Sequence, residues 1–271
     1  IGQVREAHAC TNRPIWPQSS DTPRPTEKAT PPDGMDWDLW CGPAPVRPYH
    51  PTYHPGKWRA WCDFGTGALG DMGCHIIDPL FLALKLRYPE SVEGNVSTGF
   101  ADFGHKSPVL NECFPRSSIV RYRFPARGDL PPVRVTWHQG DERPEIWKQG
   151  GIPQWRDGAL FIGKKGMLLS DYGKHVMLPE KDFAGFTRPP QKFPKATSHH
   201  QEWIDACKGK GRPLADFEYS GWLTESNHLG NVAFRAGRRL EWDAANARVT
   251  NTRAADPFLR REYRKGWELP A

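Results

Sequence analysis

The sequence predicts an α+β fold, in which a large, predominantly antiparallel open β-sheet carries helices on one face. Between residues 91 and 178, six short segments rich in β-branched and aromatic residues follow one another, most of them separated by turns that contain glycine or proline. Three longer segments, around residues 71–86, 198–209 and 219–236, predict helices from apolar spacing or from capping residues. No GxGxxG motif follows a strand, so the chain shows no dinucleotide-binding fold of its own.

The N-terminal third predicts one strand and then a long ordered loop. Residues 2–12 alternate in polarity as strands do, whereas residues 13–57 are rich in proline, which prevents long helices and central strands. The same loop carries tryptophans and tyrosines that argue against disorder, so we expect it to be packed by its own rings and to lie across the mouth of the functional pocket. Residues 35–43 predict one helical turn, capped by Asp36 and ended by Gly42.

Residues 58–86 combine aromatic side chains, a glycine-rich turn and an apolar helical stripe. Two helix starts fit this stretch. If the helix begins at Asp71, then Asp71 and His75 share one face at its N-terminal end. If Asp78 is instead the N-cap with Pro79 at the first helical position, residues 71–75 form a loop or a separate turn.

The remaining elements follow from local pattern. The six predicted strands are residues 91–100, 117–124, 133–138, 159–162, 166–170 and 175–178. They suggest an antiparallel meander with apolar residues on both faces. After the strands, Ser198 is expected to start a helix that Gly209 ends. Gly237 ends the next helix, and residues 240–251 form a last strand and turn.

Composition excludes several classes of protein. The net charge of +6 is scattered rather than gathered into a basic stripe, which argues against nucleic-acid binding. The six cysteines form no CxxC pair, so neither a zinc site nor a disulfide framework is indicated. No run of 18 apolar residues occurs, and the N-terminus lacks the plan of a signal peptide. We expect the cytoplasm as the compartment, with an export signal upstream of Ile1 left open; the absence of an initiating Met suggests a fragment or a processed product.

The chemistry-bearing candidates are Asp71, His75 and Asp78. They gather a carboxylate, an imidazole and a second carboxylate at the end of an element, where polar ligands are favoured. An imidazole suits proton transfer near neutral pH. The spacing alone is equally compatible with a structural histidine beside a turn-forming aspartate.

Four stretches of the chain together resemble the second domain of the Gfo/Idh/MocA (glucose-fructose oxidoreductase / inositol dehydrogenase) family, over nearly its whole length. They are IGQVREAHACTNRPIWPQ, WDLWCGPAPVRPYHPTYHPGKWRAWCDFGTGALGDMGCHIID, DGALFIGKKGMLL and HHQEWIDACKGKGRPLADFEYSGWLTESNHLGNVAFRAGRRLEWD. Members of that family join an N-terminal Rossmann domain, which binds NAD or NADP, to a dihydrodipicolinate-reductase-like C-terminal domain that binds substrate and makes subunit contacts. The glycine-rich and Glu-Lys-Pro motifs of the family are missing here. We therefore expect residues 1–271 to be the substrate-binding and oligomerisation domain, without the NAD(P)-binding domain and inactive alone.

The resemblance also assigns roles to residues. The DxxxH motif of the family matches Asp71 and His75, which implies that His75 is the general base and that Asp71 orients the substrate. Asp78 remains an N-cap in this interpretation. His199, at a helix start, is implied to lie near the substrate pocket, although a capping role fits it equally well.

Other residues are candidates for substrate binding, each with a structural alternative. Trp37, Tyr53 and Trp58 could stack on a sugar face, although a tryptophan-rich loop is more often its own core. Arg59 could clamp an anion or a hydroxyl, although a solvated surface role is commoner. His50 and His54 have metal-ligand spacing, but the prolines beside them disfavour the helix that spacing needs, so we expect no metal.

These observations predict the substrate-binding half of a nicotinamide-dependent oxidoreductase that acts on a secondary hydroxyl of a sugar, glycoside or cyclitol. Two alternatives stay open: a glycosidase or lyase that uses transient oxidation with retained NAD, and a binding or structural module without a cofactor. The expected partners are a small sugar or polyol and further copies of the chain, joined through the second face of the sheet, which would otherwise be left exposed. Neither a nucleic acid nor a membrane is expected.

Overall fold

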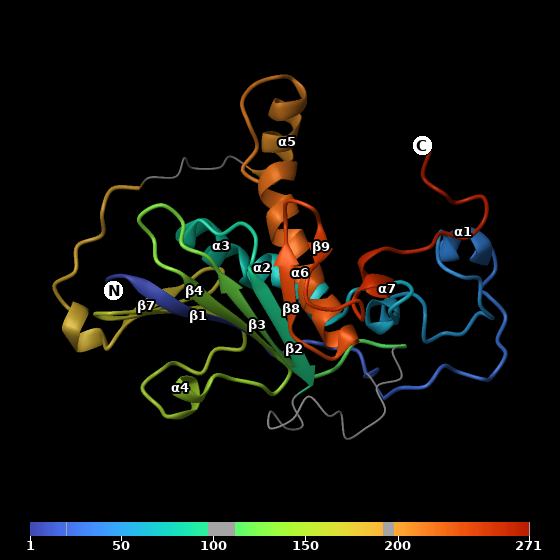
Figure 1. Cartoon of the computed structure of the whole chain (residues 1–271), viewed down its shortest axis with the longest axis horizontal. Coiled ribbons are helices and arrows are strands. Elements are labelled where there is room, and N and C mark those ends of the chain that lie inside the picture. The colour runs from blue at the N-terminus through green and yellow to red at the C-terminus, as the bar shows by residue number, and fades with distance from the viewer. Residues whose placement is uncertain (20, 97–111, 192–197, 271) are drawn as a thin grey trace.

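The computed structural model describes residues 1–19, 21–96, 112–191 and 198–270, and within them nine strands form one sheet. Their order across the sheet is β7-β6-β5-β1-β4-β3-β2-β8-β9 (Figure 1). The strands are β1 (Val4–Thr11), β2 (Ser91–Val96), β3 (Ser118–Phe124), β4 (Val133–Gln139), β5 (Gly158–Gly163), β6 (Gly166–Ser170), β7 (His175–Leu178), β8 (Leu240–Asp243) and β9 (Arg248–Val249). All the predicted strands are thereby confirmed, as far as the described residues reach; the end of the predicted strand 91–100 lies outside them.

The described helices include the four predicted segments and two short helices that were not predicted. They are α1 (Trp37–Cys41), α2 (Gly67–Ile76), α3 (Asp78–Leu84), α4 (Glu145–Lys148), α5 (His199–Cys207), α6 (Phe217–Ala236) and α7 (Asp256–Leu259), with 3₁₀ turns η1 (Lys57–Ala60) and η2 (Glu180–Phe183). Asp36, Ser198 and Asp216 accept hydrogen bonds from backbone N–H groups as N-caps, and Gly42 and Gly237 are C-caps. Local capping chemistry therefore sets the limits of α1, α5 and α6.

The sheet is mostly antiparallel, with one parallel pair at its centre. β1 pairs parallel with β4 and antiparallel with β5, so that it joins two meanders, β2–β3–β4 and β5–β6–β7. The expectation of a plain meander was incomplete because it left out β1. A parallel pair needs a long crossover connection, which the residues between β1 and β4 supply.

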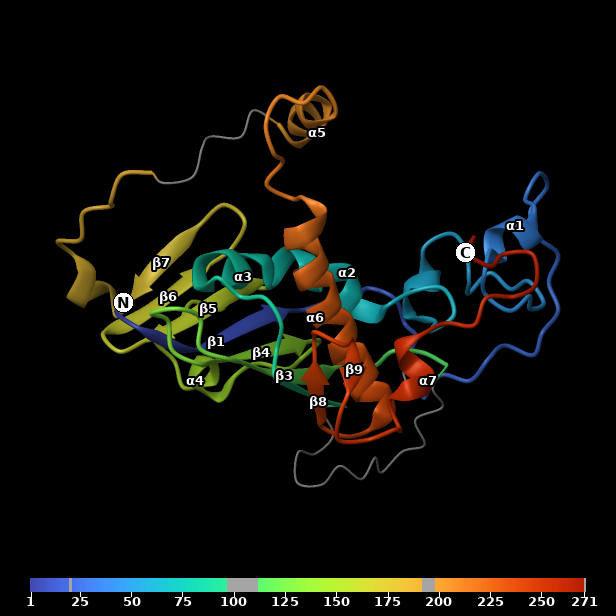
Figure 2. The same cartoon turned by 45° about the horizontal axis from the view of Figure 1, so that its top comes forward.

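One face of the sheet carries the main core beneath α2, α3 and α6 (Figure 2). Phe81 of α3 meets Phe124 of β3 edge to face, with ring centroids 5.6 Å apart, and both rings are fully buried. α6 packs closely on α2: a Cβ on Gly73 would overlap the side chain of Asn227. Burial of each large apolar side chain stabilises the fold by about 1.5–3 kcal/mol, so this layer fixes where α2 lies.

The opposite face is apolar at one end and charged over the rest. Next to β5–β7, Trp147 of α4 is fully buried against Leu160 and Leu169. Over β1–β4 the face instead carries Glu6, His8, Glu93, Ile119, Arg121, Arg123, Arg134 and His138. On β3 this face carries the apolar Ile119 beside Arg121 and Arg123, as alternation predicts, so apolar residues occur on both faces but this one is mostly charged.

The proline-rich loop is ordered where the structure describes it and packs through its own rings, as predicted. Trp37 stacks on Trp40 with centroids 4.8 Å apart, and Tyr53 meets Trp61 at 4.9 Å. The C-terminal tail lies on the same region, at the right in Figures 1 and 2, where Arg264 forms an ion pair with Asp38. We call the packed rings of the loop and of the residues that follow it the aromatic cluster; its members are Trp16, Trp37, Trp40, Tyr53, Trp61 and Phe64.

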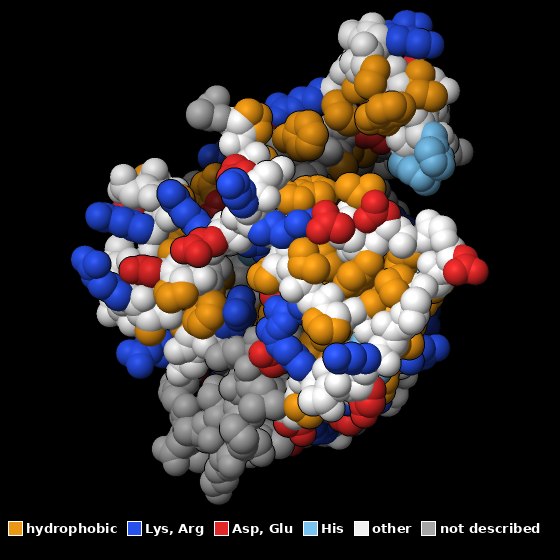
Figure 3. Space-filling model, turned by 90° about the vertical axis from the view of Figure 1, so that its right-hand side faces the viewer, with side chains coloured by type: hydrophobic (Ala, Val, Ile, Leu, Met, Phe, Trp, Pro, Cys, Tyr) orange, Lys and Arg blue, Asp and Glu red, His pale blue; other side chains and the backbone are white. Residues whose placement is uncertain are grey.

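α5 extends away from the body of the molecule beyond the start of α6 (Figures 1 and 2). None of its residues is buried, and Trp203 is 67% exposed. Figure 3 shows hydrophobic side chains gathered on the protruding upper lobe. Among the described helices no single one has both the length and the apolarity to cross a bilayer; only α2 and α3 taken together do, and a 45° bend separates them.

Candidate active site

The candidate site lies on the outer side of α2, which begins earlier than either predicted start. Its first residue is Gly67, with Thr66 as N-cap, and α3 follows after a bend of 45°. Asp71 and His75 are therefore both helical and share a side, but they lie in the middle and the last turn rather than at the N-terminal end. The backbone of Gly67 allows this start, because its φ of +64° is in the left-handed region.

Asp71 is held by a neighbouring arginine. Nε of Arg59 lies 3.1 Å from Oδ1 of Asp71, and Nη1 of Arg59 donates to the carbonyl oxygen of Gly56 at 3.0 Å. The guanidinium also lies over the ring of Trp58, 4.8 Å from the ring centroid. Three predicted site residues, Trp58, Arg59 and Asp71, are thus brought together, and the positive charge of Arg59 balances Asp71.

His75 lines a cavity of about 330 Å³, which lies between α2 and α3 on one side and the start of β5 and the end of β6 on the other. Its ring is exposed and lies 6.0 Å from the ring of Tyr172, at 62°. The lining residues of the described part are Cys74, His75, Ile76, Asp78, Pro79, Gly158, Ala159, Ser170, Asp171 and Tyr172. None of them belongs to the loop 13–57, most of whose rings pack into the aromatic cluster, although Gly56 of that loop contacts Arg59 beside Asp71.

Asp78 is the first residue of α3, preceded by Ile77 as the N-cap, so the predicted N-cap role is displaced by one residue. Its Oδ1 accepts a hydrogen bond of 2.6 Å from the hydroxyl of Tyr219. Burial, and then the bond to Asp78, raises the pKa of Tyr219. Tyr219 therefore remains a neutral donor and fixes the carboxylate at the cavity wall.

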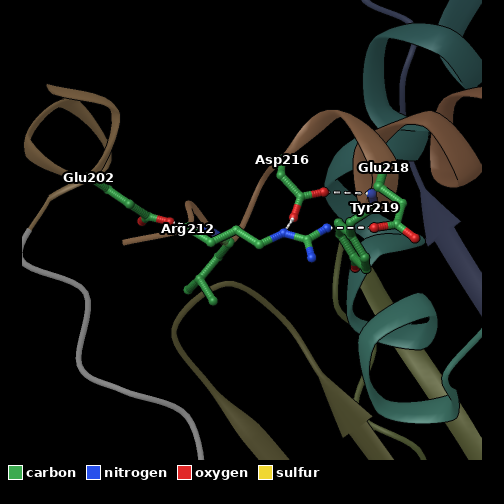
Figure 4. A network of polar contacts seen from close by, with 6 residues as sticks. Glu202, Arg212, Asp216, Glu218 and Tyr219 are labelled. Atoms are coloured by element: carbon green, nitrogen blue, oxygen red, sulfur yellow. Dashed lines mark hydrogen bonds and ion pairs between the residues drawn. The ribbon is translucent and has the colours of Figure 1, made fainter. Parts of the chain in front are cut away.

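A network of polar contacts surrounds Tyr219 at the start of α6 (Figure 4). Arg212 pairs with both Asp216 and Glu218, and Asp216 caps α6 by accepting from the backbone N–H of Tyr219 at 2.9 Å. The hydrogen bond from Arg212 lowers the pKa of Asp216. The start of α6, and with it Tyr219, is thereby held beside α3.

The other predicted site residues lie elsewhere. Trp37 and Tyr53 belong to the aromatic cluster, where Tyr53 is only 3% exposed and the indole N–H of Trp37 donates to the carbonyl oxygen of Arg47. The ring of His199 lies against that of His200 at the start of α5, with centroids 4.0 Å apart and planes tilted by 39°. These three side chains do not line the cavity beside His75, and neither do Trp58, Arg59 and Asp71.

Sequence reasoning missed Ser170, Asp171 and Tyr172, which form the wall opposite His75 at the turn between β6 and β7. Asp171 accepts a hydrogen bond from the backbone N–H of Tyr172, and its own N–H donates to the carbonyl oxygen of Lys174. The short strands predicted this turn. Nothing local indicates its proximity to α2, which depends on the pairing of β5 between β1 and β6.

The glycines before α2 do not form a dinucleotide cradle. Such a cradle needs a glycine-rich turn after a strand, open to the pyrophosphate. Here the turn follows η1, and Cβ atoms on Gly65 and Gly67 would overlap the backbone of Arg59 and the ring of Phe114. The described residues therefore do not fit NAD or NADP at this turn. They also contain no group of three or more His, Cys, Asp or Glu side chains arranged for a metal ion.

A second group of titratable residues, also missed from the sequence, lies on the charged face of the sheet. Nε2 of His8 lies 3.1 Å from Oε1 of Glu6, and Nδ1 of His8 lies 3.1 Å from Nε2 of His138. The hydrogen bond from His8, together with Arg134, lowers the pKa of Glu6 to about 2. Burial, and next the charge on His8, lowers the pKa of His138 to about 2, so His138 is neutral.

Residues 16–102 match the family model of the C-terminal alpha/beta domain of the Gfo/Idh/MocA oxidoreductases. The match covers about a third of the chain and includes the loop, α2 and α3. No curated protein is similar enough to this chain to count as a match.

Several solved structures are similar in fold at low identity. An NAD-binding protein from Listeria innocua is 16% identical, with a TM-score of 0.44 over 69% of this chain and 51% of that one. The WlbA dehydrogenase from Bordetella pertussis, in complex with NADH and UDP-GlcNAcA, is 11% identical, with a TM-score of 0.48 over 89% and 56%. Biliverdin reductase from Synechocystis sp. PCC 6803, with biliverdin and NADP+, is 13% identical, with a TM-score of 0.33 over 86% and 56%. This chain spans a little over half the length of each.

Proposed function

We propose that the chain is the substrate-binding half of a nicotinamide-dependent oxidoreductase, because residues 16–102 match the model of the C-terminal domain of the Gfo/Idh/MocA oxidoreductase family. Its substrate is a sugar, glycoside or cyclitol that reacts at a secondary hydroxyl. The nicotinamide, as NAD or NADP, binds outside the described residues, because the glycine turn before α2 is filled by the chain itself.

The observation that carries this proposal is the pair formed by the half-buried Asp71 and the exposed His75 on α2, inside the stretch that matches the family. Oxidation of an alcohol requires a group that takes the hydroxyl proton. His75 is exposed at the cavity and can accept that proton through a ring nitrogen. Asp71, held by Arg59, can accept a hydrogen bond from a second hydroxyl and so orient the substrate.

The test is made in a protein that contains both this chain and a cofactor-binding domain. We expect His75→Ala to lower kcat by roughly 10²- to 10⁴-fold, with a smaller effect on cofactor affinity, which is the usual contribution of a general base. His175→Ala is the matched control, because His175 is also exposed but lies outside the cavity lining. Full activity of the His75 variant would overturn the proposed role.

Two further measurements separate the alternatives. Turnover of a glycoside without a net change in NADH absorbance would favour a glycosidase or lyase that oxidises its substrate transiently. Isothermal titration of residues 1–271 alone should show no tight NAD binding; tight binding would contradict our assignment of the cofactor to another part of the protein.

We also propose that copies of this chain associate through the charged face of the sheet. Arg123 and Arg134 lie directly opposite each other on β3 and β4, with Glu6 and Glu93 on the same face. Within the chain Arg134 pairs with Glu6 at 2.9 Å and Arg123 pairs with Glu90 at 3.4 Å, and all four side chains remain at least partly exposed. A second copy presenting the same mixture of charges would add ion pairs to these exposed groups.

A further inference from the structure

The cavity beside His75 has an uneven distribution of charge. Its lining in the described part includes the acidic Asp78 and Asp171 and the imidazole of His75, but no lysine or arginine. Burial raises the pKa of the Cys74 thiol, so this side chain adds no charge. The wall is therefore rich in hydrogen-bond acceptors and poor in cations.

Lys174, Arg59 and Arg13 are not among the residues that line this cavity. Lys174, in the same turn as Asp171, places its ammonium group over the ring of Trp155, 4.3 Å from the ring centroid. Arg59 pairs with Asp71. Arg13 acts on Tyr172 from outside the lining, but burial and the carboxylates of Asp157 and Asp171 outweigh it and raise the pKa of the Tyr172 phenol.

We propose that this cavity selects a neutral, hydroxyl-rich ligand over a counterpart that carries a carboxylate or a phosphate, and that Asp171 and Tyr172 determine this selectivity. The inference rests on the function proposed above and names the substrate class of the same site. Carboxylates accept strong hydrogen bonds from sugar hydroxyls, and the ring of Tyr172, 66% exposed, offers an apolar surface beside them. An anionic ligand would instead face two carboxylates without a cation in the lining.

The test measures binding, so it needs no cofactor and its result is independent of catalysis. The full chain is titrated with methyl β-D-glucopyranoside and with methyl β-D-glucuronide, in which a carboxylate replaces the hydroxymethyl group of the glucoside. The two affinities are measured by saturation-transfer NMR. We expect the neutral glycoside to bind on the order of tenfold or more tightly than the acid. Equal or tighter binding of the acid, or no binding of the glycoside, would overturn the proposal.

Variants assign the selectivity to residues. Asp171→Asn should shift the ratio of the two affinities toward the acid by roughly tenfold, because it removes one negative charge from the wall. Tyr172→Ala should weaken both ligands alike. Asp141→Asn is the control, since it removes the same charge at an exposed site outside the lining. An unchanged ratio in Asp171→Asn, with the fold intact by circular dichroism, would contradict the role of that residue.

If the glycoside binds selectively and the His75 variant keeps full activity, this inference stands and the proposed catalysis fails. If the acid binds as tightly as the glycoside and the His75 variant loses activity, the proposed catalysis stands and the proposed selectivity fails.

Discussion

At the scale of single residues, Asp71 and His75 differ in their surroundings although they share one side of α2. Asp71 is balanced by Arg59, whereas His75 faces the cavity and Tyr172. The Arg59–Asp71 pair is partly exposed, so it contributes only about 0.2–1 kcal/mol to stability. Its main effect is to fix the direction of the Asp71 carboxylate, which is what a substrate hydroxyl would encounter.

His138 makes stability depend on pH. Its folded pKa is about 2 and its ordinary value is 6.5, so below pH 6.5 the unfolded chain binds a proton that the folded chain does not. The contribution of neutral His138 to the free energy of unfolding is complete above pH 6.5 and is lost as the pH falls, by at most about 1.4 kcal/mol per pH unit. The lowered pKa of Glu6 also contributes to the free energy of unfolding; this contribution is complete above pH 4.5 and is lost towards pH 2. Urea unfolding at pH 7.5 and 5.5 should show the decrease.

The variant His138→Gln should flatten this dependence between pH 7.5 and 5.5. His175→Gln should leave it unchanged, because His175 is exposed in the folded state. A slope that survives in His138→Gln would show that another group causes it.

At the scale of elements, the start of α2 positions the whole site. Gly67 combines a left-handed backbone with close contact to Phe114, and the helix that follows carries Asp71 and His75. α2 is then fixed by α6, which approaches it closely at Gly73. The site therefore depends on backbone positions that carry no chemistry themselves.

Gly67→Ala should destabilise the protein by about 1–2 kcal/mol from backbone strain alone, and by more if the Phe114 ring cannot move. Gly221→Ala is the matched control: Gly221 lies in α6 with no atom within 4 Å of an added Cβ. Because alanine favours helices, this control should stabilise by about 0.5–1 kcal/mol. Guanidinium unfolding measures both, and equal effects of the two substitutions would contradict the strained helix start.

At the scale of the whole molecule, the two faces of the sheet differ in burial and in charge. One face is buried beneath α2, α3 and α6 and supports the site. The other is covered by α4 near β5–β7, while its charged part over β1–β4 lines a cavity of about 600 Å³. That charged part is the surface we assign to self-association.

Sedimentation equilibrium should accordingly show reversible self-association that weakens at high salt, since charge pairs between exposed groups are screened. Arg123→Glu should shift the equilibrium by changing one charge on this face. Arg188→Glu, exposed and outside the charged cavity, should not. A strict monomer at high protein concentration and low salt would reject the proposed association.

The sequence by itself determined most of the elements of this protein. Alternation and capping are local, so β2–β7, α5 and α6 could be predicted from neighbouring residues, whereas Asp71 and His75 were selected by their spacing together with the family resemblance. Only the tertiary structure decided that β1 lies between β4 and β5, that Tyr172 faces His75, and that Tyr53 is enclosed in the aromatic cluster. These relations join residues far apart in the chain. They depend on how side chains from separate elements fill one core, which no local pattern records.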